Sequence, residues 1–259
     1  MTKRKRSQST TPNKKRKVDD SYNNDDLNTI FNNKSQFQGM MKKYWLQRHK
    51  LFTKYDEGIL LTKELWFSVT PENISKYIAK YIGKQFNNKF TILDTFCGGG
   101  GNIVQFLNFN CNVIGVDINP IHLQCTRNNS IVYHGENIEE RLKLLKIDWN
   151  CINEGTSVNQ LKDMKIDCVF GSPPWGGPEY IKTKIYDLET MLLPCGLSKH
   201  LQYMKQFSPN IYLFLPKNSN LNQIKLATSL NNYKKVQVIY LNNKDNRIKG
   251  ILCCWKGNM

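Results

Sequence analysis

From residue 89 to residue 255, short apolar runs alternate with stretches of helical pattern, and this alternation constrains the fold more than any other feature. Alternating strands and helices form a mostly parallel sheet that is covered by helices. The predicted strands are residues 89–96, 112–117, 167–170 and 210–216, followed by a closing hairpin at 235–241 and 248–255. The predicted helices are residues 102–109, 120–133, 192–205 and 221–230. Residues 138–149 have helical composition, but the alternation requires a strand near 144–147. We therefore expect an α/β fold with a seven-stranded, mostly parallel sheet and an antiparallel hairpin at its end.

The chain before this sheet is predicted to have two parts. Residues 1–35 are polar and poor in apolar groups, so they are expected to be disordered. Residues 36–82 are expected to form a helical extension to the main domain at 83–259. One helix is predicted over 37–55, and a second begins with Thr70 as N-cap and Pro71 at the first helical position. Its predicted apolar face consists of Ile74, Tyr77, Ile78 and Tyr81.

The net charge of +16 indicates a polyanionic partner, and nucleic acid is the first candidate for that partner. A membrane surface is the weaker alternative, because no basic amphipathic helix stands out. The clusters 3-KRKR-6 and 14-KKRKV-18 resemble a bipartite nuclear import signal, although a basic tail that contacts RNA would have the same composition. We expect a nuclear protein, located within the nucleus in the nucleolus.

The cysteines and histidines do not indicate disulfides or a metal site. None of the eight cysteines forms a CxxC pair, and the four histidines lack metal-ligand spacing. No apolar run approaches bilayer length and no secretory segment follows the start, so we expect a soluble intracellular protein without metal.

A glycine-rich turn with an acid before it, 94-DTFCGGGGN-102, joins a predicted strand to a predicted helix. Consecutive glycines allow the backbone to approach a ligand, and a helix start offers free N–H groups. The sixth position counted from Gly98 is Ile103, so the turn does not fit the dinucleotide-binding pattern G-x-G-x-x-G. It resembles instead D-x-F-x-G-x-G-G, the first motif of S-adenosylmethionine-dependent methyltransferases. That resemblance implies that Asp94 orients the ammonium group of the methyl donor.

Two further acids follow predicted strands. Asp117 lies 23 residues after Asp94, where an acid accepts hydrogen bonds from ribose hydroxyls. It is equally compatible with a helix-capping role ahead of Pro120. Asp148 is a candidate acceptor for the adenine amine, and an ordinary surface aspartate is nearly as good an interpretation.

The segment 171-GSPPWGGPEY-180 follows the strand at 167–170 and presents one indole on a stiff loop. Its prolines restrict the backbone, and the glycines after Trp175 permit close approach. A tryptophan that only fills the core is the alternative interpretation. Its S-P-P-W resembles the [D/N/S]-P-P-[Y/F/W] motif of methyltransferases that modify exocyclic or side-chain nitrogens. Such a nitrogen needs a fixed orientation toward the methyl group more than a strong base, and Ser172 with the loop carbonyls can accept its protons.

Several motifs together resemble the trimethylguanosine synthases: 44-YWLQRHKLFTKYDEGI-59, 66-WFSVTPE-72, 94-DTFCGGGGN-102, 117-DINP-120, 128-NN-129 and 171-GSPPWGGPEY-180. The resemblance covers about residues 40–255. It implies a class I methyltransferase fold, S-adenosylmethionine as cofactor without metal, and two successive methylations of the exocyclic N2 of a 7-methylguanosine cap. The implied substrates are small nuclear and nucleolar RNAs, with core proteins of their ribonucleoproteins as candidate partners, and no membrane.

The same resemblance implies roles for individual residues. The catalytic loop contributes Ser172, Pro173 and Trp175. The cap is held by Trp66, Ser68, Lys43, Trp175, Lys217 and Asn218. The cofactor is held by Phe52, Thr70, Asp94, Phe96, Gly98, Asn102, Asp117, Ile118 and Asp148. Lys217 stands where the family often has arginine, so a charge remains but the bidentate fork is lost.

A methylated guanine suits the indole on physical grounds. Methylation at N7 makes the base cationic, and a desolvated cation on tryptophan gains up to about 2 kcal/mol. Two other functions share some of these motifs: an N6-adenine methyltransferase of nucleic acids, and a non-catalytic cap-binding protein on a methyltransferase fold.

Overall fold

The computed structural model describes residues 29–87, 89–153, 156–243 and 245–257. Both basic clusters of the predicted import signal lie outside the described residues. The proposed boundaries at residues 35 and 82 remain predictions. None of the described helices is long and apolar enough to span a membrane.

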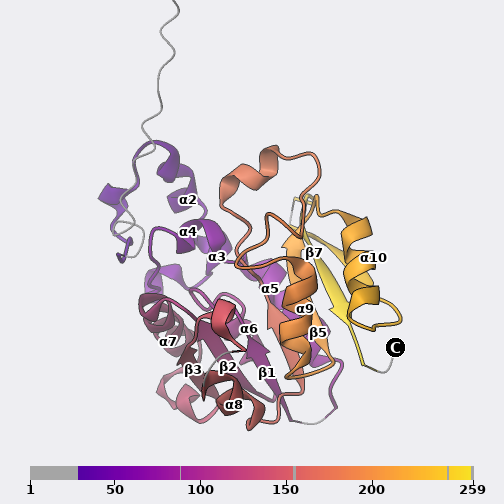
Figure 1. Cartoon of the computed structure of the whole chain (residues 1–259). Coiled ribbons are helices and arrows are strands. Elements are labelled where there is room, and N and C mark those ends of the chain that lie inside the picture. The colour runs from indigo at the N-terminus through magenta and orange to yellow at the C-terminus, as the bar shows by residue number, and fades with distance from the viewer. Residues whose placement is uncertain (1–28, 88, 154–155, 244, 258–259) are drawn as a thin grey trace, which may run out of the picture.

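Seven strands form one sheet in the order β3-β2-β1-β4-β5-β7-β6 (Figure 1). Neighbouring strands from β3 to β5 pair in parallel, and β7 runs antiparallel to both β5 and β6. The predicted fold class, including the closing hairpin and the ambiguous third strand, is confirmed. The strands are β1 (Phe90–Asp94), β2 (Cys111–Asp117), β3 (Leu142–Lys146), β4 (Cys168–Gly171), β5 (Ile211–Pro216), β6 (Gln237–Asn242) and β7 (Ile248–Trp255).

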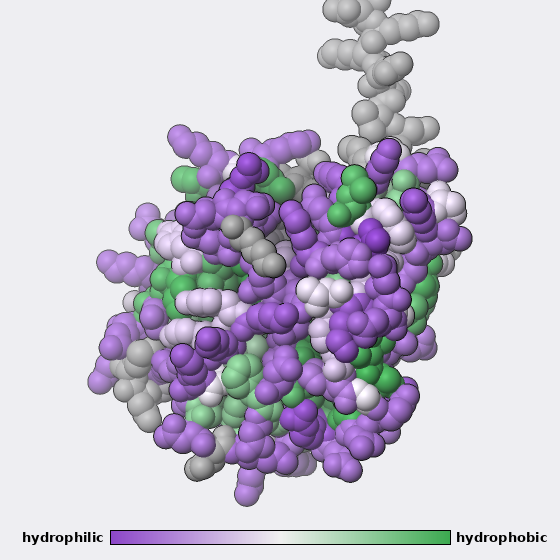
Figure 2. All heavy atoms as spheres, turned by 180° about the vertical axis from the view of Figure 1, so that it is seen from behind, coloured by the Kyte–Doolittle hydropathy of each residue, from purple (hydrophilic) through white to green (hydrophobic). Residues whose placement is uncertain are grey.

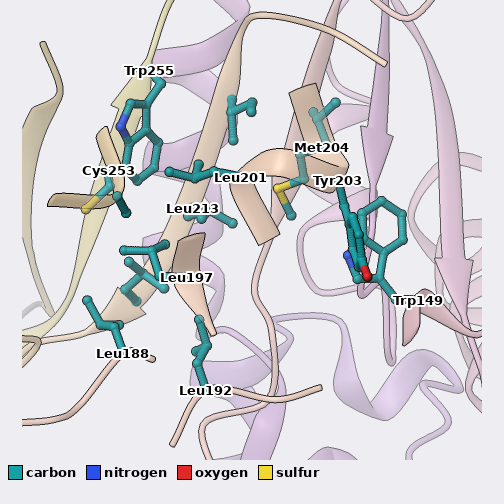
Figure 3. Close-up of a cluster of buried hydrophobic side chains, with 14 of the residues drawn as sticks. Trp149, Leu188, Leu192, Leu197, Leu201, Tyr203, Met204, Leu213, Cys253 and Trp255 are labelled. Atoms are coloured by element: carbon teal, nitrogen blue, oxygen red, sulfur yellow. The ribbon is translucent and has the colours of Figure 1, made fainter. Parts of the chain in front are cut away.

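Helices cover both faces of the sheet, as a parallel sheet requires. One face packs against α5 (Glu72–Gly83), α6 (Ile103–Phe106) and α7 (Pro120–His134). The other packs against α8 (Thr156–Lys162), α9 (Leu197–Lys205) and α10 (Leu221–Leu230). Figure 3 shows part of this second core, where Leu197, Leu201 and Met204 of α9 lie beside Leu213 of β5. Hydrophilic residues cover most of the molecule seen from behind (Figure 2).

The N-terminal extension consists of short elements, so the prediction of one helix over 37–55 is wrong. They are η1 (Lys34–Gln36), η2 (Gly39–Met41), α2 (Lys42–Leu46), α3 (Arg48–Leu51), η3 (Tyr55–Glu57) and α4 (Leu65–Ser68). The rings of Phe37 and Tyr55 both pack on Trp66, with centroids 4.6 and 5.3 Å away. A straight helix would hold residues 37 and 55 about 27 Å apart. Convergence on one indole therefore requires the chain to turn repeatedly.

Helix α5 begins one residue later than predicted. Pro71, not Thr70, is its N-cap residue, and no side chain caps it. The Thr70 hydroxyl instead accepts a hydrogen bond from Asn102 Nδ2 at 3.2 Å. The predicted apolar face is also wrong at one position, because Tyr77 is 48% exposed while Ile74 and Ile78 are buried.

Three further 3₁₀ turns connect the elements of the main domain: η4 (Glu136–Glu140), η5 (Trp149–Cys151) and η6 (Pro178–Lys182). Two predicted helices are shorter than expected, since α6 covers four residues and α9 begins at Leu197. In Figure 1 the extension and the segment after β4 lie at the same end of the sheet. This is the end at which the parallel strands terminate.

Candidate active site

The predicted site residues of the main domain lie at the carboxyl ends of adjacent parallel strands. Asp94 ends β1 and Asp117 ends β2, while Ser172 follows β4. Asp94 pairs with Phe170 in the β1–β4 register, and Thr95 N–H donates to Phe170 O at 3.0 Å. The strand order reverses direction between β1 and β4, which is where open α/β sheets bind ligands.

Asp94 is a buried carboxylate with one oxygen left without a partner. Its side chain has no exposed surface, and Oδ1 accepts from the Phe96 N–H at 3.2 Å. Oδ2 is buried and has no hydrogen-bond partner among the described residues. Burial raises the pKa of Asp94 to about 7, the Phe96 N–H opposes this shift, and the nearby Asp117 charge adds to it. A buried acceptor of this kind gains most from a cationic ligand such as an ammonium group.

The glycine turn lies directly beside this carboxylate and is fixed by the second acid. Gly98 has φ +51° and donates its N–H to Asp117 Oδ2 at 2.9 Å. At the end of the turn, the amide of Asn102 bonds Thr70 through Nδ2, while its buried Oδ1 has no partner among the described residues. Two buried oxygens without partners among the described residues, on Asp94 and Asn102, therefore flank this glycine turn.

Asp117 is half-buried, and each carboxylate oxygen accepts a backbone hydrogen bond, Oδ1 from Asn119 at 2.8 Å and Oδ2 from Gly98. Both oxygens keep lone pairs for ribose hydroxyls. The next residue, Ile118, exposes 57% of its surface and offers an apolar face beside the acid. Asp148 caps η5 by accepting from Asn150 N–H, so its predicted contact with adenine remains a prediction. The residues from Asp94 to Ile118 fit S-adenosylmethionine.

The catalytic loop leaves the sheet with Pro173 buried and Trp175 half-buried. The indole packs against Tyr180 at 5.2 Å and Phe214 at 5.1 Å between ring centroids. Its Nε1 is buried without a partner among the described residues. Trp175 thus contacts the core and keeps part of its ring accessible. The two glycines after it, Gly176 and Gly177, have φ +79° and +78°, which favours glycine.

His200 is a residue of this region that the sequence did not identify. It is fully buried on α9, its Nε2 lies 3.2 Å from Leu193 O, and its ring meets Phe96 edge-on at 5.5 Å. Leu193 N–H in turn donates to Pro174 O at 3.1 Å. Burial lowers the pKa of His200 to about 4, so the ring is neutral and Nε2 carries the proton given to the carbonyl. These contacts connect Phe96, in the loop after β1, with Pro174, in the loop after β4.

The extension places its predicted ligand residues in two different environments. Phe52 and Trp66 expose 0% and 1% of their surface, and the Trp66 indole donates to Phe31 O at 2.7 Å. Both rings belong to the core of the extension, and their predicted contacts with cofactor and guanine remain predictions. Lys43 and Ser68 are exposed, and Ser68 donates to Glu64 O.

Asn129 holds the extension on the glycine turn. Its amide is fully buried, accepts from Leu60 N–H at 2.7 Å, and donates to Leu60 O and Gly99 O, both at 2.9 Å. His122 makes a second connection, with Nε2 3.2 Å from Thr62 Oγ1 and Nδ1 3.4 Å from Asp117 Oδ1. The 128-NN-129 pair was part of the resemblance, but no sequence pattern indicated this clamp.

After β5, Lys217 is exposed at the same end of the sheet. Asn218 donates through Nδ2 to Thr183 O at 2.6 Å and to Tyr180 O at 3.4 Å, which fixes the segment that follows the catalytic loop. Its Oδ1 is buried without a partner in the described part of the chain. Within the described residues, no group of three or more His, Cys, Asp or Glu side chains is arranged to hold a metal ion.

The fold and the site define a class I S-adenosylmethionine-dependent methyltransferase. The fold is similar to that of the METTL16 MTase domain, with a TM-score of 0.54 and 14% identity over 83% of this chain and 79% of that one. Residues 89–258 match the RNA cap guanine-N2 methyltransferase family, and the chain belongs to this family. It is 42% identical to trimethylguanosine synthase of Saccharomyces cerevisiae over 90% of this chain and 72% of the relative. It is 34% identical to trimethylguanosine synthase of Schizosaccharomyces pombe over 74% of this chain and 77% of the relative.

Proposed function

We propose that this methyltransferase converts the 7-methylguanosine cap of small nuclear and nucleolar RNAs into a 2,2,7-trimethylguanosine cap by two successive methylations of N2. The observation that carries the proposal is the placement of Asp94 and the Trp175 loop at the ends of adjacent strands, in a chain similar to trimethylguanosine synthases. A cofactor acid and an aromatic surface for a base therefore belong to one site.

S-adenosylmethionine supplies an electrophilic methyl group when it is bound. Asp94 would hold the cofactor ammonium, and Asp117 would hold its ribose. Trp175 holds the cationic guanine flat, and its attachment to β4 through two prolines limits how far the base can tilt. Ser172 and the loop carbonyls accept hydrogen bonds from the N–H groups of N2. For each methyl group that N2 gains as the donor's sulfur–carbon bond breaks, N2 loses one proton to water.

The experiment is methyl transfer by the purified full-length chain with a labelled methyl donor. Three substrates are compared: the 7-methylguanosine cap dinucleotide m7GpppG, the unmethylated GpppG, and an adenine-containing oligonucleotide. We expect two methyl groups per m7GpppG and little transfer to GpppG, because the uncharged base loses the cation–π contribution. Transfer to adenine would identify an N6-adenine methyltransferase. Cap binding without transfer would identify a non-catalytic cap-binding protein, and either result would overturn the proposal.

We also propose that the enzyme acts in the nucleus, concentrated in the nucleolus, and that core proteins of small ribonucleoproteins present its substrates. The two basic clusters at residues 3–6 and 14–18 support nuclear import. Unchanged nuclear accumulation of a tagged chain without residues 1–20 would contradict the import assignment.

A further inference from the structure

His200 is a buried histidine that the proposed mechanism does not use. It exposes none of its surface, and its Nε2 lies 3.2 Å from Leu193 O. Its Nδ1 is buried and has no hydrogen-bond partner among the described residues. Burying an imidazole in this way costs desolvation that an aliphatic side chain of similar size would avoid. Packing alone therefore does not account for a histidine at this position.

Helix α9 holds the imidazole on a firm support. At the start of the helix, the backbone N–H and the hydroxyl of Ser198 donate to Glu189 Oε1 at 3.1 and 2.7 Å. One turn after His200, Met204 packs against the end of β4, where a Cβ placed on Gly171 would lie 2.6 Å from Met204 Cε. The helix is thus fixed at its own start and against the strand that leads into the catalytic loop.

One side of the imidazole contacts the loop that follows β1. The ring of Phe96 meets it edge-on, with centroids 5.5 Å apart and an angle of 82° between the ring planes. The backbone N–H of Phe96 donates to Asp94 Oδ1 at 3.2 Å. A shift of Phe96 would therefore disturb the carboxylate that is assigned to the cofactor ammonium.

The other side of the imidazole holds the loop that follows β4. Leu193 accepts the hydrogen bond from His200 through its carbonyl, and its own N–H donates to Pro174 O at 3.1 Å. That carbonyl belongs to the planar peptide group that joins Pro174 to Trp175. The two hydrogen bonds therefore fix the backbone from which the indole projects.

The separation of these two loops matters for methyl transfer. Strands β1 and β4 are paired as far as Asp94 and Phe170, so Phe96 and Trp175 both lie beyond the last pair of the ladder. The methyl carbon and the attacking nitrogen must be aligned at about 3–3.5 Å, and a misplacement of about 1 Å can cost about 100-fold in rate. The side chain of His200 contacts both loops where the ladder no longer holds them.

We propose that His200 is a positioning residue for methyl transfer, which sets the separation between the cofactor loop after β1 and the Trp175 loop after β4. It acts through Phe96 and Leu193, and not by contact with a reacting atom. This inference rests on the proposed function, because it assumes that guanine stacks on Trp175 while its N2 accepts the methyl group.

The test measures kcat, the KM for m7GpppG and the cofactor Kd in three variants of the full-length chain. His200→Leu removes the donor, and we expect kcat to fall about 10- to 100-fold while KM and Kd stay within about twofold of wild type. His200→Gln places an amide N–H near the position of Nε2, and its kcat should stay within about threefold of wild type. His200→Asn is too short to reach Leu193 O and should resemble the leucine variant. The glutamine and asparagine variants carry the comparison if His200→Leu does not fold.

A second readout does not depend on the substrate. Hydrogen–deuterium exchange measures the protection of the Leu193 amide, which donates to Pro174 O in the wild type. We expect this amide to exchange faster in His200→Leu and at the wild-type rate in His200→Gln. Unchanged protection in the leucine variant would show that His200 does not hold the catalytic loop.

The matched control is Leu201→Ala, at the next position of α9, where the side chain is fully buried beside Leu213 of β5 (Figure 3). It should lower Tm while kcat stays within about twofold of wild type, because it leaves both contacts of His200 in place. An unchanged kcat in His200→Leu would overturn the inference, as would a glutamine variant no better than leucine. An equal loss of kcat in Leu201→Ala would make His200 a structural residue. Absence of transfer to m7GpppG by the wild type would count against the proposed function, and the exchange of the Leu193 amide would still test the role of His200.

Discussion

At the scale of single residues, the site depends on buried polar atoms that lack partners within the described chain. Asp94 Oδ2 and Asn102 Oδ1 are such acceptors, and both lie beside the glycine turn. An unpaired buried acceptor costs stability, so its presence at a strand end indicates a ligand that completes it.

Cofactor affinity is expected to rise with pH through the pKa of Asp94. The folded protein without ligand holds this carboxyl protonated below about 7, compared with 3.8 as the usual value. The group therefore stabilises the ligand-free fold most below pH 3.8, and this contribution is lost as pH rises through 7. An ammonium ligand binds the ionised form, so the Kd measured by calorimetry should be about tenfold higher at pH 6 than at pH 8.

Asp94→Asn is the matched control for this titration, because the amide keeps the shape and cannot ionise. It should bind the cofactor weakly and without the pH dependence between 6 and 8. A wild-type Kd that does not change over this range would contradict the role assigned to Asp94.

Trp175→Ala is expected to lower kcat/KM for methyl transfer strongly while the cofactor Kd stays within about twofold of wild type. Loss of cation–π attraction and stacking removes roughly 2–3 kcal/mol of guanine binding, about 30- to 150-fold in kcat/KM. Trp175→Phe should retain part of the activity. Because the indole also packs on Phe214, thermal unfolding of each variant must be measured alongside. A large loss of cofactor affinity would make Trp175 a structural residue.

At the scale of elements, the extension packs directly against the main domain beside the glycine turn. Its core packs on Val104 of α6 and Cys125 of α7, and Asn129 ties Leu60 to Gly99. The glycine turn is therefore held from outside the main domain. Changes in the extension should reach the cofactor through this clamp.

Asn129→Ala is expected to lower the free energy of unfolding by roughly 2–4 kcal/mol, since it leaves three buried backbone groups of Leu60 and Gly99 without a partner. Urea denaturation measures this change. Asn128→Ala is the comparison, because its side chain donates only through Nδ2, to Gly58 O at 2.8 Å and to Asn129 Oδ1 at 3.2 Å, and it leaves the bonds of Asn129 to Leu60 and Gly99 in place, so it should cost about 1 kcal/mol. Equal losses for the two variants would show that the clamp adds nothing specific.

At the scale of the whole molecule, the net positive charge favours binding of a polyanion such as RNA. The net charge is +16, and hydrophilic side chains dominate the face in Figure 2. Such a surface attracts a polyanion at long range, and salt screens that attraction.

The KM for a capped RNA is expected to rise steeply with salt, with a log–log slope of about 0.7 for every phosphate contacted. The KM for m7GpppG should rise less steeply, because fewer phosphates are bound. Steady-state kinetics between 50 and 200 mM KCl measure both slopes, because the screening length falls from about 14 to about 7 Å over this range. Equal slopes would mean that the protein contacts no phosphates beyond the cap.

Sequence patterns determined the sheet, the glycine turn, the acids Asp94 and Asp117, and the catalytic loop. Each is a local property: strand periodicity, glycine backbone freedom and proline restriction act over a few residues. The family resemblance followed from the same local motifs. They were sufficient to predict the reaction that the family carries out.

Only the tertiary structure decided which side chains are buried, which are exposed, and which partners they bond. Trp66 lies in the core of the extension, because Phe31, Phe37 and Tyr55 approach it from positions far apart in the sequence. The roles of His200 and Asn129 in connecting distant segments follow from the tertiary structure, which brings Leu193 O to His200 and the carbonyls of Leu60 and Gly99 to Asn129. Tyr77 was expected to be buried and is 48% exposed, whereas Ile74 and Ile78 of the same helix are buried. Burial and hydrogen bonding depend on residues that are close in space but far apart in the sequence, so a local sequence pattern does not predict them.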